Sequence, residues 1–371
     1  MKVPFVSFAD MHAPIQEALQ AAAMRVIASN WFILGKELSN FEAAYAQFNQ
    51  VQYAIGVGNG LEALHIALAV LGIGKGDEVI VPSNTYIATW LAVSQVGATP
   101  IPVEPRLDTY NLDPLKIEAA ITPNTKAIMP VHLYGQACQM DAIMAIAEKY
   151  QLYIIEDNAQ AQGATFNGKK TGAFGHINAT SFYPGKNLGA LGDAGAITSN
   201  DDNLAKAAQM FRNYGSEVKY FNEYKGINSR LDELQAAFLA VKLPFLTQWN
   251  AQRQALAALY IQKLAHLQPQ IILPYTVEKA THIYHVFLIR TQQRDALQAF
   301  LQNKGISTLI HYPVPPHLQK AYTELGYQKG DFPIAETLAA TALSLPLYPN
   351  MPLEAIDYIC SQIEEFFKLQ P

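Results

Sequence analysis

Cysteine is scarce in this sequence. Of 371 residues only two are cysteines, Cys138 and Cys360, and they stand far apart without a CxxC motif. Such spacing excludes the usual cysteine-rich zinc sites, and a low cysteine content is typical of a reducing compartment. We therefore expect no metal site and a cytoplasmic protein.

Charged residues are also scarce, and the sequence has no long run of basic residues and no long apolar run. Charged residues make up 15% of the chain, the net charge is −5 and no basic run stands out, so we expect no nucleic-acid partner. The apolar run at 61–74 contains Glu62 and His65 and is too short to cross a bilayer. Pro4 and Asp10 interrupt the apolar residues at the N-terminus. We expect neither membrane insertion nor secretion.

What is present is a regular alternation of apolar strand patterns and helical patterns. The strand patterns lie at residues 53–58, 77–83, 99–104, 126–135, 152–157, 179–184 and 195–199. Helical patterns, such as those at 61–71 and 139–150, separate several of them. Continuous apolar strands that alternate with helices predict an α/β domain with a mostly parallel sheet, of seven strands if each pattern forms one.

The pattern changes after about residue 244. A long helical run at 244–267 leads into a strand pattern at 284–290, and a helix pattern at 293–303 follows. We expect a large domain over residues 1–244, with the N-terminal segment included, and a smaller C-terminal α+β domain over residues 245–371. Ligands of parallel α/β sheets bind at the carboxyl ends of the strands, so these ends are the place to search for function.

A glycine-rich turn, GVGNG at 56–60, joins the first strand pattern to a helix pattern. Glycines let a phosphate approach the backbone, and a helix N-terminus offers free N–H groups. A plain strand-to-helix turn fits this piece equally well. A dinucleotide fingerprint fits less well, because Leu61 stands where a third glycine or alanine belongs. The expected ribose-binding acid is also misplaced, since Asp77 and Glu78 open the next strand. Ser181, before a Pro-Gly turn, is a second candidate for the same anion.

The strand pattern LYIIED ends in Glu156 and Asp157, which places both acids at the carboxyl edge of the sheet. Glu156 alone is interpreted as a solvated loop acid or a helix cap. Lys186 is an isolated lysine among small and apolar residues, and desolvation would make its amine nucleophilic. Pyridoxal phosphate (PLP) enzymes need such a lysine, a carboxylate for the pyridine nitrogen and an anion site. Tyr86 is placed to stack on the ring.

Five ordered motifs carry a resemblance to a known family. They are GVGNGLEALHIAL, VPSNTYIATW, IEDNAQAQGA, SFYPGKNLGALGDAGAI and YKGINSRLDELQAA. Together they resemble the DegT/DnrJ/EryC1/StrS family of PLP-dependent sugar aminotransferases, from about residue 4 to residue 350. The resemblance implies the fold-type I aminotransferase architecture and a homodimer with shared active sites.

The resemblance also implies roles for individual residues. Lys186 would carry the internal aldimine and then move the proton of the reaction, and Asp157 would bind the pyridinium nitrogen. Gln160 would lie near the cofactor hydroxyl, and Tyr86 would stack on the ring. The implied phosphate ligands are Gly58, Asn59, Gly60, Ser181 and, reaching the partner subunit's site, Asn228.

Two stretches are candidates for contacts to a sugar nucleotide. Residues 212–233 fit a solvated surface loop by composition, but in the family this stretch crosses to the neighbouring site, where cations would pair with a diphosphate. The Pro-rich stretch at 312–316 fits a rigid linker equally well. The implied substrate ligands are Tyr183, Lys219, Arg230, His311 and Tyr312.

The chain departs from the family motifs at a few positions. Where we expect IEDAAQAHGA, Asn158 replaces an alanine and Gln162 replaces the histidine. Where we expect GDGGA, Ala194 replaces a glycine. None of these changes removes a role named above, but they alter the polarity around the cofactor ring.

The motifs PSNTYIATW, HLYGQ, NYGSEVKY and IHYPVPPH are most similar to those of enzymes that aminate C3 of a dTDP-3-keto-6-deoxyhexose. The resemblance therefore implies an L-glutamate-dependent 3-aminotransferase that makes a dTDP-3-amino-3,6-dideoxyhexose. The alternatives are a C4 aminotransferase for a dTDP- or UDP-4-keto sugar, an NAD-dependent nucleotide-sugar dehydrogenase, and a non-catalytic regulator. The presence of both Lys186 and Asp157 argues against the regulator.

Overall fold

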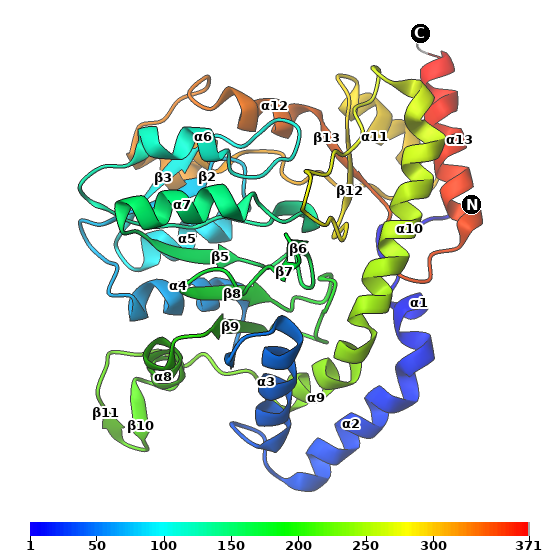
Figure 1. Cartoon of the computed structure of the whole chain (residues 1–371). Coiled ribbons are helices and arrows are strands. Elements are labelled where there is room, and N and C mark those ends of the chain that lie inside the picture. The colour runs from blue at the N-terminus through cyan, green and yellow to red at the C-terminus, as the bar shows by residue number, and fades with distance from the viewer. Residues whose placement is uncertain (370–371) are drawn as a thin grey trace.

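A computed structural model describes residues 1–369 of the chain (Figure 1). Its central sheet consists of β1 (Tyr53–Val57), β2 (Glu78–Pro82), β3 (Thr99–Val103), β4 (Thr125–Ile128), β5 (Tyr153–Asp157), β8 (Ile177–Ser181) and β9 (Gly195–Ser199). The seven strands lie in the order β1-β9-β8-β5-β4-β2-β3. Only β9 runs antiparallel to its neighbours, β1 and β8, and the other pairs are parallel. The predicted mostly parallel sheet is confirmed.

Helices cover both faces of this sheet (Figure 1). One layer contains α4 (Gly60–Val70), α5 (Ile87–Gln95) and α8 (Asp202–Phe211), and the other contains α6 (Pro114–Ile117) and α7 (Met140–Tyr150). Val79 and Val81 of β2 pack into the core with the first layer, and Ile80 packs into the core with the second. Because successive strand residues point to opposite faces, a strand between two helix layers must be apolar throughout.

A third group of helices packs beside β1 and β9. It consists of α2 (Gln16–Ser29), α3 (Lys36–Asn49) and α9 (Glu233–Lys242). Leu38, Phe41 and Tyr45 of α3 are fully buried in a core with Ala54 of β1 and Ala196 of β9. This core lies under the loop that joins β8 to β9, which carries Lys186.

The C-terminal part has its own core. Its elements are α10 (Leu246–Leu264), β12 (Phe287–Arg290), α11 (Arg294–Asn303), α12 (Pro333–Thr341), β13 (Ala342–Leu345) and α13 (Leu353–Leu369). Val3 and Met11, the latter in α1 (Phe8–His12), are buried in this same core, and Val3 forms a bridge with Ile306. Val3 and Met11 thus pack in the core of the C-terminal part. The boundary at residue 244 stays a prediction.

Three strand patterns extend at least three residues beyond one end of the strand that forms. The pattern at 126–135 gives only β4, because Pro130 has no N–H to donate and Tyr134 has a positive φ of 59°. The pattern at 179–184 ends at Ser181, before the turn at Pro184, and that at 284–290 begins only at Phe287, after Tyr284 with a φ of 48°. The helix predicted at 244–267 is α10 with one short helical turn at each end.

Two small hairpins project from this framework. They are β6 (Thr165–Phe166) with β7 (Lys169–Lys170), and β10 (Ser216–Val218) with β11 (Phe221–Asn222). The second hairpin lies beyond α8 at the edge of the molecule, far from α10 (Figure 1). None of the helices within residues 1–369 is both long and apolar enough to span a bilayer.

Candidate active site

Asp157 ends β5 and lies at the carboxyl edge of the sheet, as the sequence predicts. Its Oδ2 accepts a hydrogen bond of 2.9 Å from Thr89 Oγ1, and its Oδ1 accepts one of 3.1 Å from the Ala159 N–H. Burial raises the pKa of this carboxyl, and the hydrogen bonds and the charge of Lys186 oppose the rise. Each oxygen still has a free lone pair, so the carboxylate can accept a further donor.

Lys186 lies in the loop between β8 and β9, and its backbone N–H donates to the Tyr183 carbonyl at 2.8 Å. Its side chain forms no ion pair or hydrogen bond with any of residues 1–369 in this structure. Burial lowers the pKa of this amine to about 8, while the nearby charge of Asp157 raises it. The pair predicted from the sequence is therefore brought together, and about a tenth of the amine is neutral at pH 7, far more than for a solvated lysine.

The turn before α4 forms a cradle for an anion. Asn59 Oδ1 accepts from the Glu62 N–H at 2.9 Å, and the Asn59 carbonyl accepts from Ala63, which leaves the N–H groups of Gly60 and Leu61 without acceptors in the described part of the chain. A Cβ on Gly60 would lie 2.7 Å from Cβ of Ser181. Only glycine therefore lets Ser181 approach the positive end of this helix.

Gly58 differs from the other predicted phosphate ligands. Its N–H already donates to Ser229 Oγ at 3.0 Å. Ser229 is a residue that sequence reasoning missed, because it lies far from the glycine-rich turn in the chain and its motif, YKGINSRLDELQAA, was interpreted only for Asn228 and Arg230. The phosphate role of Gly58 stays a prediction.

The aromatic residues form one wall of the site. The ring centroids of Tyr86 and Tyr312 are 5.1 Å apart, and Tyr86 is 52% exposed at the start of α5. Gln160 Nε2 donates to Tyr312 Oη at 3.0 Å, and Gln160 Oε1 accepts from the Tyr134 N–H at 2.6 Å. The carboxamide of Gln160 thus holds the aromatic wall, and its contact to a cofactor hydroxyl stays a prediction.

His311 and Tyr183 complete this part of the site. His311 Nδ1 lies 2.9 Å from Ser344 Oγ, and burial first, then the charge of Lys186, lowers its pKa to about 4. A neutral imidazole next to Lys186 can donate to or accept from a sugar hydroxyl. Tyr183 is 59% exposed, three residues before the lysine, and is free to meet a ligand.

Lys219, Asn228 and Arg230 are the predicted site residues of the stretch at 212–233. Lys219 and Asn228 are exposed, and neither is joined to Lys186 by a hydrogen bond or ion pair among residues 1–369. Arg230 Nη1 donates to Asn213 Oδ1 at 3.0 Å, while its buried Nε lacks an acceptor in this part of the chain. A buried donor without an acceptor is costly, so Arg230 retains the capacity to bind an anion.

The structure corrects the interpretation of Glu156 as a solvated acid or a helix cap. Its side chain is completely buried, and it accepts hydrogen bonds from the N–H groups of Gly172, Phe174 and Gly175 at 2.9, 2.6 and 2.9 Å. His132 Nε2 lies 2.7 Å from the same carboxylate. The sequence gives no hint of these partners, because they come from a separate loop and strand end.

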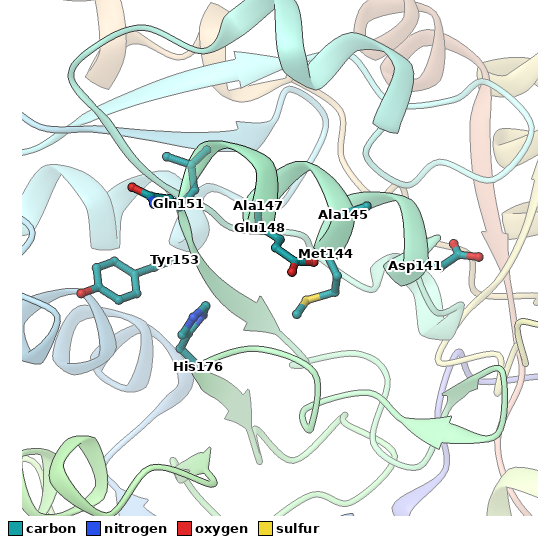
Figure 2. A pocket seen from close by; sticks show the side chains of 9 residues that line it. Asp141, Met144, Ala145, Ala147, Glu148, Gln151, Tyr153 and His176 are labelled. Atoms are coloured by element: carbon teal, nitrogen blue, oxygen red, sulfur yellow. The ribbon is translucent and has the colours of Figure 1, made fainter.

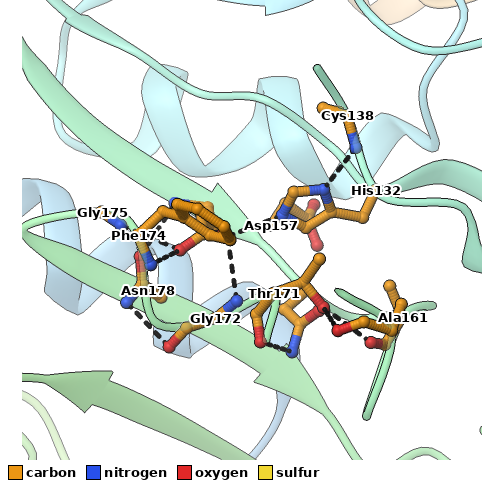
Figure 3. A network of polar contacts seen from close by, with 12 residues as sticks. His132, Cys138, Asp157, Ala161, Thr171, Gly172, Phe174, Gly175 and Asn178 are labelled. Atoms are coloured by element: carbon orange, nitrogen blue, oxygen red, sulfur yellow. Dashed lines mark hydrogen bonds and ion pairs between the residues drawn. The ribbon is translucent and has the colours of Figure 1, made fainter. Parts of the chain in front are cut away.

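Figure 3 shows the network around this carboxylate. The Cys138 N–H donates to His132 Nδ1 at 3.0 Å, so this nitrogen is unprotonated and the ring donates to Glu156 through Nε2. The backbone N–H of His132 also donates to the Asp157 carbonyl at 3.1 Å. His132 and Thr89 are therefore further residues near the site that sequence reasoning missed.

A surface groove of about 620 Å³ lies elsewhere, along α7 (Figure 2). Tyr153 and His176 line it, and they stand at the amino ends of β5 and β8. Asp157 and Ser181 stand at the opposite ends of the same strands. The groove is therefore not part of the candidate active site.

The residues at the carboxyl edge fit PLP. A buried carboxylate with free lone pairs suits the pyridine N–H, and a lysine with a lowered pKa suits the aldehyde. The free N–H groups at the start of α4 and the hydroxyl of Ser181 suit the phosphate. These features were predicted from three separate motifs, and the fold brings them to one edge of the sheet.

Comparisons with known proteins agree with this fit. The model of the DegT/DnrJ/EryC1/StrS aminotransferase family matches residues 14–364. The chain is 50% identical over 364 residues to dTDP-3-amino-3,6-dideoxy-alpha-D-galactopyranose transaminase of Aneurinibacillus thermoaerophilus, covering 98% of this chain and 99% of that protein. It is 50% identical over 350 residues to dTDP-3-amino-3,4,6-trideoxy-alpha-D-glucose transaminase of Streptomyces venezuelae, covering 94% and 92%.

Two solved structures are also similar to this chain in fold and sequence. The structure of S. venezuelae DesV in complex with a ketimine intermediate has a TM-score of 0.96 at 48% identity and covers 98% of each chain. NtdA of Bacillus subtilis, solved with bound cofactor PMP, has a TM-score of 0.91 at 35% identity and covers 99% of this chain and 85% of that one. The chain therefore belongs to the DegT/DnrJ/EryC1/StrS aminotransferase family.

Proposed function

We propose that this chain is a PLP-dependent sugar aminotransferase that converts a dTDP-3-keto-6-deoxyhexose to a dTDP-3-amino-3,6-dideoxyhexose with L-glutamate as the amino donor. The observation that carries the proposal is the pair of Asp157 and Lys186 at one sheet edge, beside a free helix N-terminus. The substrate follows from the two relatives, both named as transaminases of dTDP-3-amino sugars. Family membership argues against the nicotinamide alternative. The presence of both Lys186 and Asp157 argues against the regulator.

Asp157 and Lys186 have different roles in amino transfer. Bound PLP supplies an electron sink for the carbon that gains or loses a proton. Asp157 keeps the proton on the pyridine nitrogen, and Thr89 and the Ala159 N–H fix the direction of its carboxylate. Lys186 Nζ, once free, accepts and returns the proton at the reacting carbon, because burial lowers its pKa to about 8 and so toward the working pH.

The anion contacts fall into two sets. The N–H groups of Gly60 and Leu61 and the hydroxyl of Ser181 hold the cofactor phosphate. We propose that Asn228, Lys219 and Arg230 act on the partner subunit's site in a homodimer, where the two cations bind the diphosphate of the sugar nucleotide. Tyr183, His311 and Tyr312 would then face the hexose.

The first test is the absorbance spectrum of the purified protein before and after addition of L-glutamate. We expect a visible or near-ultraviolet cofactor band that shifts when glutamate donates its amino group. Lys186→Ala should lack the covalently attached cofactor and amino transfer. Lys170→Met is a matched control, since Lys170 is also partly buried with a lowered pKa but lies on β7. A spectrum without any cofactor band after addition of PLP would refute the proposal.

The second test separates C3 from C4 amination. Purified protein, PLP and L-glutamate are mixed with a dTDP-3-keto-6-deoxyhexose, and the aminated product is measured. The same assay with dTDP- and UDP-4-keto-6-deoxyhexoses supplies the alternative. Turnover of only the 4-keto sugars would contradict the C3 assignment and leave the aminotransferase assignment intact.

A further inference from the structure

The loop that carries Lys186 is held at both ends by one buried side chain, Gln162. Its Nε2 donates to the Ser181 carbonyl at 2.7 Å, before the lysine, and to the Leu188 carbonyl at 3.3 Å, after it. Its Oε1 accepts from the Leu188 N–H at 3.0 Å. Gln162 is completely buried, so these contacts form without competition from water.

The two residues held by Gln162 are, or lie close to, the two points at which the cofactor would be bound. Ser181 is the candidate phosphate ligand, and Lys186 is the candidate attachment point. A side chain that holds Ser181 and Leu188 at once fixes the distance between the phosphate ligand and the lysine. A cofactor tied at two points can be aligned only if that distance is correct.

Two further buried polar residues, Asn250 and Asn187, connect Gln162 to the lysine loop. Asn250 of α10 donates from Nδ2 to the Gln162 carbonyl at 2.9 Å, and its Oδ1 accepts from Asn187 Nδ2 at 2.8 Å. Asn187 directly follows Lys186 in the chain. The backbone and the side chain of Gln162 therefore both connect to the same loop, and this closed network restricts movement of the lysine.

A carboxamide suits this position better than an imidazole. The amide of Gln162 donates two protons and accepts one, which matches two carbonyls and one N–H. A neutral histidine, the residue expected from the family motif, has one donor and one acceptor and must leave one of these groups without a partner. It also loses its acceptor when it is protonated.

We propose that Gln162 is a positioning residue that sets the separation between the phosphate ligand Ser181 and Lys186, and that its amide makes this separation independent of pH. The inference rests on the proposed function, because it requires Lys186 to be the point of attachment. Gln162 itself does not touch the reacting atoms.

The experiment compares Gln162→Met and Gln162→His with the wild type as PLP-loaded full-length protein. Three quantities are measured: the dissociation constant of PLP, the pH dependence of the visible cofactor absorbance, and kcat and KM with glutamate. Gln136→Met is the matched control. Gln136 is equally buried and also bonds to two backbone groups, at Tyr275 and Val277, but these lie outside the lysine loop.

We expect Gln162→Met to lower kcat by about 10- to 100-fold and to move the pH midpoint of the cofactor absorbance, while KM for glutamate changes little. Gln162→His should retain more activity at alkaline pH and lose it as pH falls through about 6.5, a step that the wild type and Gln162→Met lack. Gln136→Met should reduce thermal stability and leave the absorbance midpoint unchanged.

The outcomes separate this inference from the proposed function. If borohydride reduction and peptide mapping of the wild type find no cofactor on Lys186, the proposed function fails and this inference fails with it. If the wild type carries the cofactor on Lys186 but both Gln162 variants match Gln136→Met in absorbance midpoint and kcat, only the positioning role is overturned. If Gln162→Met does not fold, the pH profile of Gln162→His decides.

Discussion

At the residue scale, the lowered pKa of Lys186 gives a direct prediction. Burial disfavours the ammonium form, so the amine loses its proton near pH 8, and the neutral amine is the form that attacks the aldehyde of PLP. The rate at which added PLP attaches to the apoprotein should rise with pH and level off above about 8. Rapid-mixing absorbance measurements would follow this attachment.

The Asp157→Asn variant tests the cause of that pKa. The negative charge of Asp157 favours the ammonium form, so its removal should lower the pKa of Lys186 further and move the attachment profile to lower pH. A profile with its midpoint near the ordinary lysine value of about 10.4 would show that the amine is solvated, contrary to the structure.

Thr89 gives a second prediction at this scale. Its hydroxyl donates to Asp157 at 2.9 Å, and a hydrogen bond to a charged group contributes about 1.5–3 kcal/mol. Thr89→Val should therefore weaken PLP binding by roughly 10-fold or more, since 1.4 kcal/mol corresponds to a factor of ten. The measurement is titration of the apoprotein with PLP.

Thr341→Val serves as the control for Thr89→Val. Thr341 is also a buried threonine, and its hydroxyl donates to a helix carbonyl, that of Thr337, at 2.7 Å in α12. Equal losses of PLP affinity in the two variants would mean that Thr89 acts through general stability and not through Asp157.

At the element scale, Glu233 at the start of α9 caps another helix. Its carboxylate accepts from the N–H groups of Gly35, Glu37 and Leu38 at 2.7, 2.9 and 3.2 Å, in the first turn of α3. These N–H groups have no partner within their own helix. Glu233→Ala should lower the free energy of unfolding by about 2–4 kcal/mol. Chemical denaturation monitored by circular dichroism measures this loss.

Glu17 in the first turn of α2 is the matched control for Glu233. It is exposed, and a solvated acid at a helix N-terminus contributes only about 0.3–1 kcal/mol. If Glu233→Ala and Glu17→Ala destabilise the protein equally, the capping role of Glu233 is wrong.

The elements also show which sequence patterns are reliable. The pattern at 195–199 gives β9 with the same bounds. The pattern at 126–135 overestimates β4, because Pro130 and the positive φ of Tyr134 interrupt pairing inside an otherwise apolar run. Apolar periodicity thus places a strand correctly, but local backbone constraints decide where the strand ends.

At the scale of the whole molecule, the β10–β11 hairpin carries apolar side chains into solvent. Tyr220, Phe221 and Val218 are 84%, 71% and 61% exposed, next to Lys219. Exposed apolar groups of this kind mark interaction surfaces. This exposed hairpin supports the proposed homodimer with shared sites.

Subunit mixing tests the proposed sharing. Lys186→Ala and Asn228→Ala are each purified as inactive or weakly active protein, mixed, and allowed to exchange subunits. If Asn228 serves the partner subunit's site, half of the dimers are mixed and each has one intact site, so activity should recover to about a quarter of the wild-type value. Absence of recovery after verified exchange would mean that each site is built within one chain.

The sequence by itself determined the alternation of strands and helices, the acid at a strand end, the isolated lysine, and the motifs of the family. Each of these depends on local periodicity or on residues close together in the chain, and local interactions leave a pattern in the order of residues. This is why the roles of Asp157 and Lys186 could be predicted before the fold was known.

Only the tertiary structure decided which distant groups meet. Thr89 reaches Asp157, Ser229 occupies the N–H of Gly58, and Gln162 holds both ends of the lysine loop. Glu156, one residue before Asp157, faces a buried imidazole and three backbone N–H groups and not solvent. Hydrogen-bond partners of buried polar groups are selected by packing across the sheet edge, and no local pattern in the chain encodes that selection.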